Sequence, residues 1–200
     1  QGGQRRLAAA VGLDQRLELV GFGPDRGFDP AGCYRVDPDT IGQILGCGDF
    51  RVGKQLRIHG VHYIGVDIVP AVIERNRRLF ADSQTEFRRL DILLDPLPSA
   101  DLCLVRQVLQ HLSNAEIATV LSRLRSYPQV LITEHHPAPS KVVAANIDRP
   151  HGAHTRVIDG SGVFLDQPPF CQPVKLVLES PLEHPLAVPG EAIRTFSLIR

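Results

Sequence analysis

Apolar residues in this chain gather in short runs separated by polar and amphipathic segments. Runs of this length predict buried strands, at 41–45, 63–67, 86–92, 100–106, 129–133, 174–179 and 193–199. The first five runs alternate with segments that can form helices, whereas the last two are linked by a proline-rich turn region. This order predicts an α/β fold with a mostly parallel seven-stranded sheet and a late antiparallel strand.

Two helices stand out between the strand segments. The first is expected from Pro70 to Phe80, because proline suits the first turn of a helix. The second follows Ser113 and Glu116, whose spacing is that of a capping box. The apolar residues of this second helix repeat at helical spacing and are expected to cover the sheet: Ile117, Val120, Leu121 and Leu124.

A glycine loop and an acid mark the first two strands. Gly46-Cys47-Gly48 follows the first strand, and Asp67 ends the second. Glycine has no Cβ, so the backbone can turn tightly and come close to a ligand. An acid about 20 residues beyond such a loop is placed to accept hydrogen bonds from both hydroxyls of a ribose. Many structural turns contain the loop alone, but its combination with the acid predicts a cofactor with a nucleoside.

Five segments, in order and at matching spacing, resemble the class I S-adenosylmethionine-dependent methyltransferases: LGCGDF, YIGVDIVPAVIERNRRLF, FRRLDILLDPLP, ADLCLVRQVLQHLS and VLITEH. The resemblance covers about residues 41–135 and implies a Rossmann-like fold with S-adenosylmethionine as cofactor. The cofactor contacts that it implies are Gly46, Cys47 and Gly48 under the methionine part, Asp67 at the ribose with Ile68 beside it, Asp91 and Ile92 at the adenine, and Arg106 and Gln107 beside the methyl group.

Two positions depart from the pattern of this family. Ile44 stands where the family usually has an acid that holds the methionine amino group through water. Phe50 stands where a third glycine is common, so its ring must point away from the cofactor or close over it. A dinucleotide-binding oxidoreductase is a weaker alternative, because Arg51 occupies the place of the last glycine or alanine in its motif.

Two regions lie outside the repeating pattern and define the expected organisation of the chain. Residues 1–40 contain a possible helix and a loop rich in glycine and proline, which could be a lid over the cofactor or a passive cap on the sheet. Residues 41–200 form the expected methyltransferase domain. Within it, residues 137–173 lack periodicity, and a connection of this length is expected to carry function. Such insertions usually recognise the substrate in this family, so we expect an acceptor pocket with Glu134, Asp148, His151 and Arg156.

Methyl transfer to a hydroxyl requires alignment of the acceptor and removal of a proton. Histidine suits the role of base because its pKa is near neutrality. His135, expected directly after the fifth strand, is the first candidate, and His151 is the second; the alternative for both is structural pairing with nearby carboxylates. A metal site that includes His154 was considered, but a His-x-x-His loop without flanking carboxylates is weak evidence, so no metal is predicted.

Composition narrows the choice of acceptor. The chain has 22 basic and 22 acidic residues, so it offers no electrostatic footprint for nucleic acid. No apolar run is long enough to span a bilayer, no secretory signal is visible, and the cysteines lack CxxC spacing, which predicts a cytoplasmic protein. We therefore expect a small-molecule acceptor, methylated at a hydroxyl oxygen. A non-catalytic protein that binds S-adenosylmethionine is the main alternative, and the oligomeric state stays open, a homodimer included.

Overall fold

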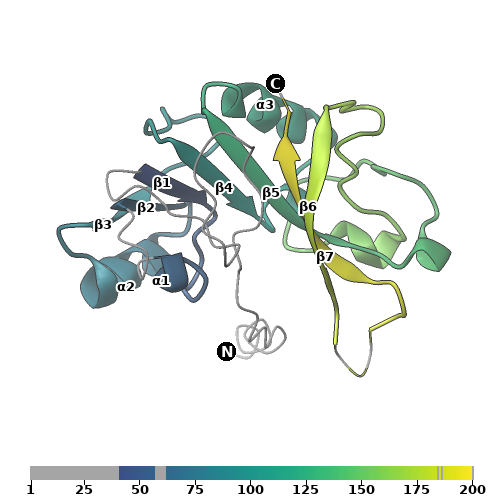
Figure 1. Cartoon of the computed structure of the whole chain (residues 1–200), viewed down its shortest axis with the longest axis horizontal. Helices are drawn as coiled ribbons and strands as arrows, with labels where there is room; N and C mark the ends of the chain where they lie inside the picture. The colour runs from purple at the N-terminus through teal and green to yellow at the C-terminus, as the bar shows by residue number, and fades with distance from the viewer. Residues whose placement is uncertain (1–40, 57–61, 184, 186, 200) are drawn as a thin grey trace, which may run out of the picture.

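A computed structural model of the protein describes residues 41–56, 62–183, 185 and 187–199 (Figure 1). In this part of the chain, seven strands form one sheet in the order β3-β2-β1-β4-β5-β7-β6. The strands are β1 (Ile41–Leu45), β2 (His62–Asp67), β3 (Thr85–Arg89), β4 (Leu102–Arg106), β5 (Gln129–His136), β6 (Val174–Pro181) and β7 (Ala192–Leu198). Strand β7 runs antiparallel to both of its neighbours, and the other pairs are parallel. The predicted fold class is confirmed.

Helices pack on both sides of this sheet. The helices are α1 (Gly53–Leu56), α2 (Pro70–Phe80) and α3 (Asn114–Leu124), with 3-10 turns η2 (Leu109–His111), η3 (Pro139–Lys141) and η4 (Arg156–Asp159). In Figure 1, α1 and α2 lie together near β1, β2 and β3, and α3 lies on the other side of the sheet. Helix α2 has the bounds that the sequence predicts.

Helix α3 begins at the predicted capping box. The Ser113 side chain accepts a hydrogen bond from the Glu116 N–H, and the Glu116 carboxylate accepts one from the Ser113 N–H. The four predicted apolar residues of this helix are all buried in the larger core cluster: Ile117, Val120, Leu121 and Leu124. Each such burial stabilises the fold by about 1.5–3 kcal/mol, so this face holds α3 on the sheet.

A smaller core cluster lies on the side of the sheet that faces α2. It is built around the Phe50 ring, whose centroid is 4.9 Å from that of Tyr63 and 4.9 Å from that of Phe87. Gly65 makes room for this cluster, because a Cβ there would lie 2.7 Å from the Phe87 ring. The ring of Phe50 therefore points into the protein and away from the glycine loop, as one of the two sequence alternatives requires.

Two of the strand boundaries that differ from the sequence prediction change the place of candidate site residues. Strand β5 continues to His136 rather than ending at Thr133, because β7 pairs with it along this extension. His135 therefore lies within the strand and not directly after it. Strand β3 ends at Arg89, so Asp91 lies in the following turn, where its carboxylate accepts a hydrogen bond from the Leu93 N–H. The expected lid or cap at residues 1–40 lies outside the described residues and stays a prediction.

Candidate functional site

The glycine loop is joined to Asp67 by a hydrogen bond across the ends of β1 and β2. The Gly48 N–H donates to Asp67 Oδ2 at 3.1 Å, and the Val69 N–H donates to Asp67 Oδ1 at 3.0 Å. A carboxylate can accept about four hydrogen bonds, so capacity remains for the two hydroxyls of a ribose. The loop and the acid that the sequence pairs by spacing thus form one rigid unit.

Backbone conformation explains both glycines of this loop. Gly46 has a φ of +72° and Gly48 has a φ of +51°, which is the left-handed region that side chains disfavour. A Cβ at Gly46 would also lie 2.2 Å from Val108 Cγ2. At Gly48 a Cβ would meet no atom of the described residues within 4 Å, so these residues leave open space beside the loop. This open side offers room for a ligand next to Asp67.

Cys47 stands between the two glycines but is not a nucleophile. Burial, with the nearby charge of Asp67 adding, raises the pKa of the Cys47 thiol to about 12, so the thiol stays protonated at neutral pH. Asn76, buried on α2, donates to the Gly48 carbonyl at 2.7 Å and fixes the loop from below. Cys47 therefore contributes to the packing beneath the loop and does not act as a nucleophile.

Strand β4 ends in a second constrained turn. Gln107 has a φ of +53°, which is rare for a residue other than glycine, and its N–H donates to the Thr133 carbonyl at 2.7 Å. Arg106, directly before it, is partly buried and makes no hydrogen bond or ion pair with another described residue. Burial lowers the pKa of the Arg106 guanidinium. The sequence places both residues correctly at the end of β4, but it gives no signal of the strained turn.

The carboxyl ends of the parallel strands bring most of the expected cofactor contacts to one edge of the sheet. Strands β3, β2, β1 and β4 are neighbours, and the chain order reverses between β1 and β4. Ligands of open α/β sheets bind at such a reversal, beyond the carboxyl ends of the strands. The residues at or just past these ends are Gly46, Cys47, Gly48, Asp67, Ile68, Asp91, Ile92, Arg106 and Gln107.

Glu134 lies at the same edge but points into the protein. It is 1% exposed, and its carboxylate accepts hydrogen bonds from the N–H groups of Val108, Leu109 and Gln110 at 2.9–3.2 Å. Burial raises its pKa to about 8, although these three donors favour the carboxylate. We expected Glu134 to contact the substrate; the structure instead places it beneath the turn that follows β4.

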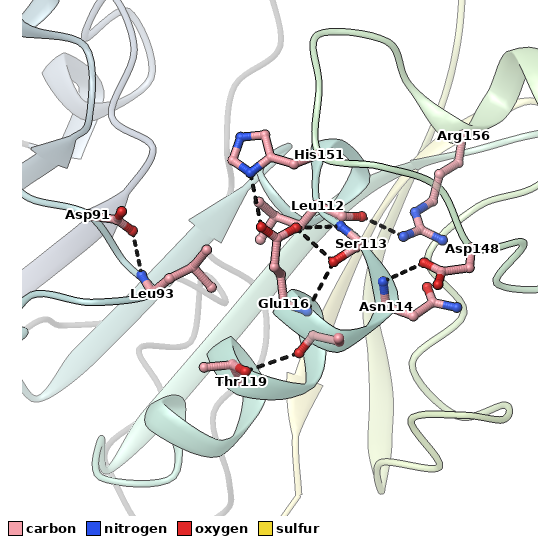
Figure 2. A network of polar contacts seen from close by, with 11 residues as sticks. Asp91, Leu93, Leu112, Ser113, Asn114, Glu116, Thr119, Asp148, His151 and Arg156 are labelled. Carbon is pink, nitrogen blue, oxygen red and sulfur yellow. Dashed lines mark hydrogen bonds and ion pairs between the residues drawn. The ribbon is translucent and has the colours of Figure 1, made fainter.

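The polar residues of the 137–173 segment anchor it to the start of α3 (Figure 2). Arg156 is 1% exposed and donates to the carbonyls of Ile147 and Leu112 at 2.6 and 2.5 Å. The Asp148 carboxylate accepts a hydrogen bond from the Asn114 N–H at 2.7 Å. Both residues were expected in the acceptor pocket, but the structure uses them to hold the segment against the turn after β4.

Asn146 organises the same segment and was missed at the sequence level. It has a φ of +52° and is 4% exposed. Its amide donates to the carbonyls of Phe164 and Pro168 and accepts from the Phe164 N–H. Asparagine tolerates the left-handed conformation better than most residues, which is the signal that could have singled it out.

Both candidate bases have a carboxylate partner. His135 Nε2 lies 2.7 Å from Glu191 Oε1, and both side chains are largely buried. His151 Nδ1 lies 3.1 Å from Glu116 Oε1, at the exposed start of α3 (Figure 2). In each pair one ring nitrogen is held and the other is left for a ligand. The two histidines lie on different elements: His135 is on β5, and His151 lies over the start of α3.

The part of the chain that the structure describes contains neither a metal-binding cluster nor a membrane-spanning helix. Within it, no group of three or more histidine, cysteine, aspartate or glutamate side chains could hold a metal ion. No helix in this part of the chain is long and apolar enough to cross a membrane.

Comparison with known proteins agrees with this geometry. Residues 44–127 match the family model described as "Methyltransferase domain". This part of the chain is similar to a methyltransferase domain, which agrees with the resemblance that the sequence motifs carry. The cofactor that such a domain implies is S-adenosylmethionine. A search of curated protein sequences found no match.

The chain also resembles solved methyltransferase structures, at low sequence identity. The N-methyltransferase NodS from Bradyrhizobium japonicum WM9 is 16% identical, with a TM-score of 0.53, and the match covers 80% of this chain and 86% of that chain. The magnesium protoporphyrin IX methyltransferase ChlM from Synechocystis PCC 6803, with bound SAM, is 15% identical, with a TM-score of 0.50 and coverage of 81% and 71%. Human N-acetylserotonin methyltransferase is 24% identical with a TM-score of 0.45, and the match covers 52% of this chain and 32% of that chain.

Proposed function

We propose that this protein binds S-adenosylmethionine at the carboxyl edge of β1–β4 and transfers its methyl group to a small molecule. The observation that carries this proposal is the hydrogen bond from the Gly48 N–H to Asp67, together with the open space that the described residues leave beside the loop. The Asp67 carboxylate would hold the ribose, and the turn with Asp91 and Ile92 would flank the adenine. The methionine part would lie over Gly46 and Gly48, beside the end of β4.

The bound cofactor supplies a methyl group activated by its sulfonium, so the protein has to align the acceptor and take up a proton. We assign the role of the base that takes up this proton to His135. His135 lies on β5 two residues past Thr133, which pairs with the last residue of β4, so His135 stands about 7 Å beyond the end of β4. Glu191 holds Nε2, which leaves Nδ1 to take the proton of an acceptor hydroxyl.

His151 is the second candidate for this role. Its ring is more exposed than that of His135, and Glu116 holds its Nδ1. It lies where the 137–173 segment meets the turn after β4, because the Gly152 N–H donates to the His111 carbonyl at 3.0 Å. Methylation at oxygen, a small-molecule acceptor and the cytoplasmic location stay predictions.

The alternative function is a protein that binds the cofactor without turnover, and it rests on the departures at Ile44 and Phe50. Ile44 is 3% exposed and packs with Phe50 in the smaller core cluster. Phe50 has a φ of +67°, which is the left-handed conformation that glycine adopts readily. The loop can therefore keep the backbone shape that a glycine would give it, while the Phe50 ring packs in the smaller core cluster. These observations support an open cofactor site, which both functions require, and formation of S-adenosylhomocysteine with an acceptor would distinguish them.

Calorimetric titration tests the proposal. Wild-type protein is titrated with S-adenosylmethionine, S-adenosylhomocysteine and NAD, and we expect only the first two to bind. Asp67→Ala should weaken this binding by about tenfold or more, because it removes a charged partner of the ribose. Asp166→Ala is the control, since Asp166 is exposed and makes no hydrogen bond with another described residue. Equal affinity of the two variants would contradict the proposed cofactor site.

A further inference from the structure

Arg106 is a cation at the cofactor edge of the sheet, and it has no hydrogen-bond or ion-pair partner among the described residues. It is partly buried at the end of β4, and no described residue accepts a hydrogen bond from its guanidinium. Burying an unpaired charge is unfavourable, and the lowered pKa of Arg106 reflects this cost of burial. The guanidinium nitrogens are not among the fully buried unpartnered atoms of the described residues, so the head group is accessible to a ligand.

The two carboxylates whose charges act on Arg106 are both occupied elsewhere. They belong to Glu134 and Asp49. Glu134 accepts hydrogen bonds from the backbone of the turn after β4. Asp49 forms an ion pair with Arg51 at 2.6 Å. The positive charge of Arg106 is therefore the charge that this part of the cleft offers to a ligand.

The neighbours of Arg106 across the sheet do not use its guanidinium either. Arg106 is paired in register with Thr133, and Thr133 with Thr195, so the three side chains form a row on one face. The two threonine hydroxyls lie 2.9 Å apart and bond to each other. The backbone beside Arg106 is fixed by the hydrogen bond from Gln107 to Thr133. The backbone of Arg106 is thus held in place, while no described residue bonds to its head group.

We propose that Arg106 binds a carboxylate of a ligand at the carboxyl edge of β1–β4. An arginine fork matches a carboxylate with two parallel hydrogen bonds, and such pairs are strong when partly buried. The proposal rests on the proposed function, because the carboxylate belongs either to the methionine part of the cofactor or to an acidic acceptor. The first source would offset the lost acid at Ile44, since the methionine part would then be held by its carboxylate instead of its amino group.

The test compares Arg106→Gln and Arg106→Lys with Arg78→Gln, which removes a charge from the exposed side of α2. Each protein is titrated with S-adenosylhomocysteine and with 5′-methylthioadenosine, which lacks the amino-acid part. If the cofactor is the source, Arg106→Gln binds S-adenosylhomocysteine about tenfold or more weakly and 5′-methylthioadenosine unchanged. Arg106→Lys should lose less, because it keeps the charge.

Two further titrations cover the acceptor. With S-adenosylhomocysteine present, 4-hydroxybenzoate and its methyl ester are added in turn. If the acceptor is the source, wild-type protein binds the acid more tightly than the ester, and Arg106→Gln loses this preference. If Arg106→Gln matches Arg78→Gln in all four titrations, the proposal is wrong. Failure of wild-type protein to bind S-adenosylhomocysteine would instead contradict the proposed function.

Discussion

Replacing His136 by phenylalanine should remove a large part of the acid sensitivity of the fold. His136 is 1% exposed, and its ring centroid lies 5.1 Å from that of Phe164 and 5.5 Å from that of Phe196. Neither ring nitrogen has a hydrogen-bond partner among the described residues. Burial, with the charges of Arg194 and His135 adding, lowers the pKa of His136 from 6.5 to about 4.

Proton linkage sets the direction in which the free energy of unfolding changes with pH. The unfolded chain binds a proton at His136 more readily than the folded protein, so protonation favours unfolding. The stability that the neutral ring contributes is complete above about pH 6.5 and is lost as the pH falls toward 4. With these two pKa values, the free energy of unfolding falls by about 2 kcal/mol between about pH 7.5 and about pH 5 through this group alone.

Urea unfolding followed by circular dichroism at the two pH values measures this loss. The wild-type loss should exceed that of His136→Phe by about 2 kcal/mol, because phenylalanine fits between the two rings and does not titrate. His154→Phe is the control, since it removes a histidine from the exposed surface of the 137–173 segment and should keep the wild-type pH dependence. An equal loss in wild-type protein and His136→Phe would refute the reasoning.

Two substitutions test the assignment of the site. His135→Gln should lower turnover by about a hundredfold, because it removes the proposed base, and should change the affinity for S-adenosylhomocysteine by less than about twofold; an unchanged rate of S-adenosylhomocysteine formation would exclude this role. Gly46→Ala should lower both stability and cofactor affinity, because it combines a φ of +72° with a contact of 2.2 Å to Val108. Gly160→Ala, with a φ of +65°, is the matched control: it should lower stability in the same urea assay without changing affinity in calorimetry, so equal affinity losses would count against a specific role of Gly46.

Local patterns account for the parts of the fold that the sequence predicts well. The bounds of β1 and α2 and the cap of α3 depend on residues within a few positions of each other. The cofactor edge is predictable for a related reason. Parallel strands end at the same edge of a sheet, so Gly46, Asp67 and Arg106 must lie there once the strands are recognised.

Long-range contacts explain what the sequence could not show. Glu134 and His135 look like a polar strand end, but pairing with β7 extends β5 through them. An arginine in a loop is normally exposed, yet Arg156 is buried because the carbonyls of Ile147 and Leu112 meet at its guanidinium. Strand β7 and Leu112 both lie far along the chain from the residues that they contact, so no local sequence pattern predicts these contacts.

Phe50 shows how the glycine loop can lose a glycine and keep its shape. A left-handed φ costs a side chain roughly 1–2 kcal/mol. The Phe50 ring is 1% exposed and packs edge-on against Tyr63 and Phe87. Burial of such a ring contributes about 1.5–3 kcal/mol, and each aromatic pair adds about 0.5–1.5 kcal/mol. Packing therefore outweighs the backbone strain, and the departure from the family pattern strengthens the core beneath the loop without filling the space above it.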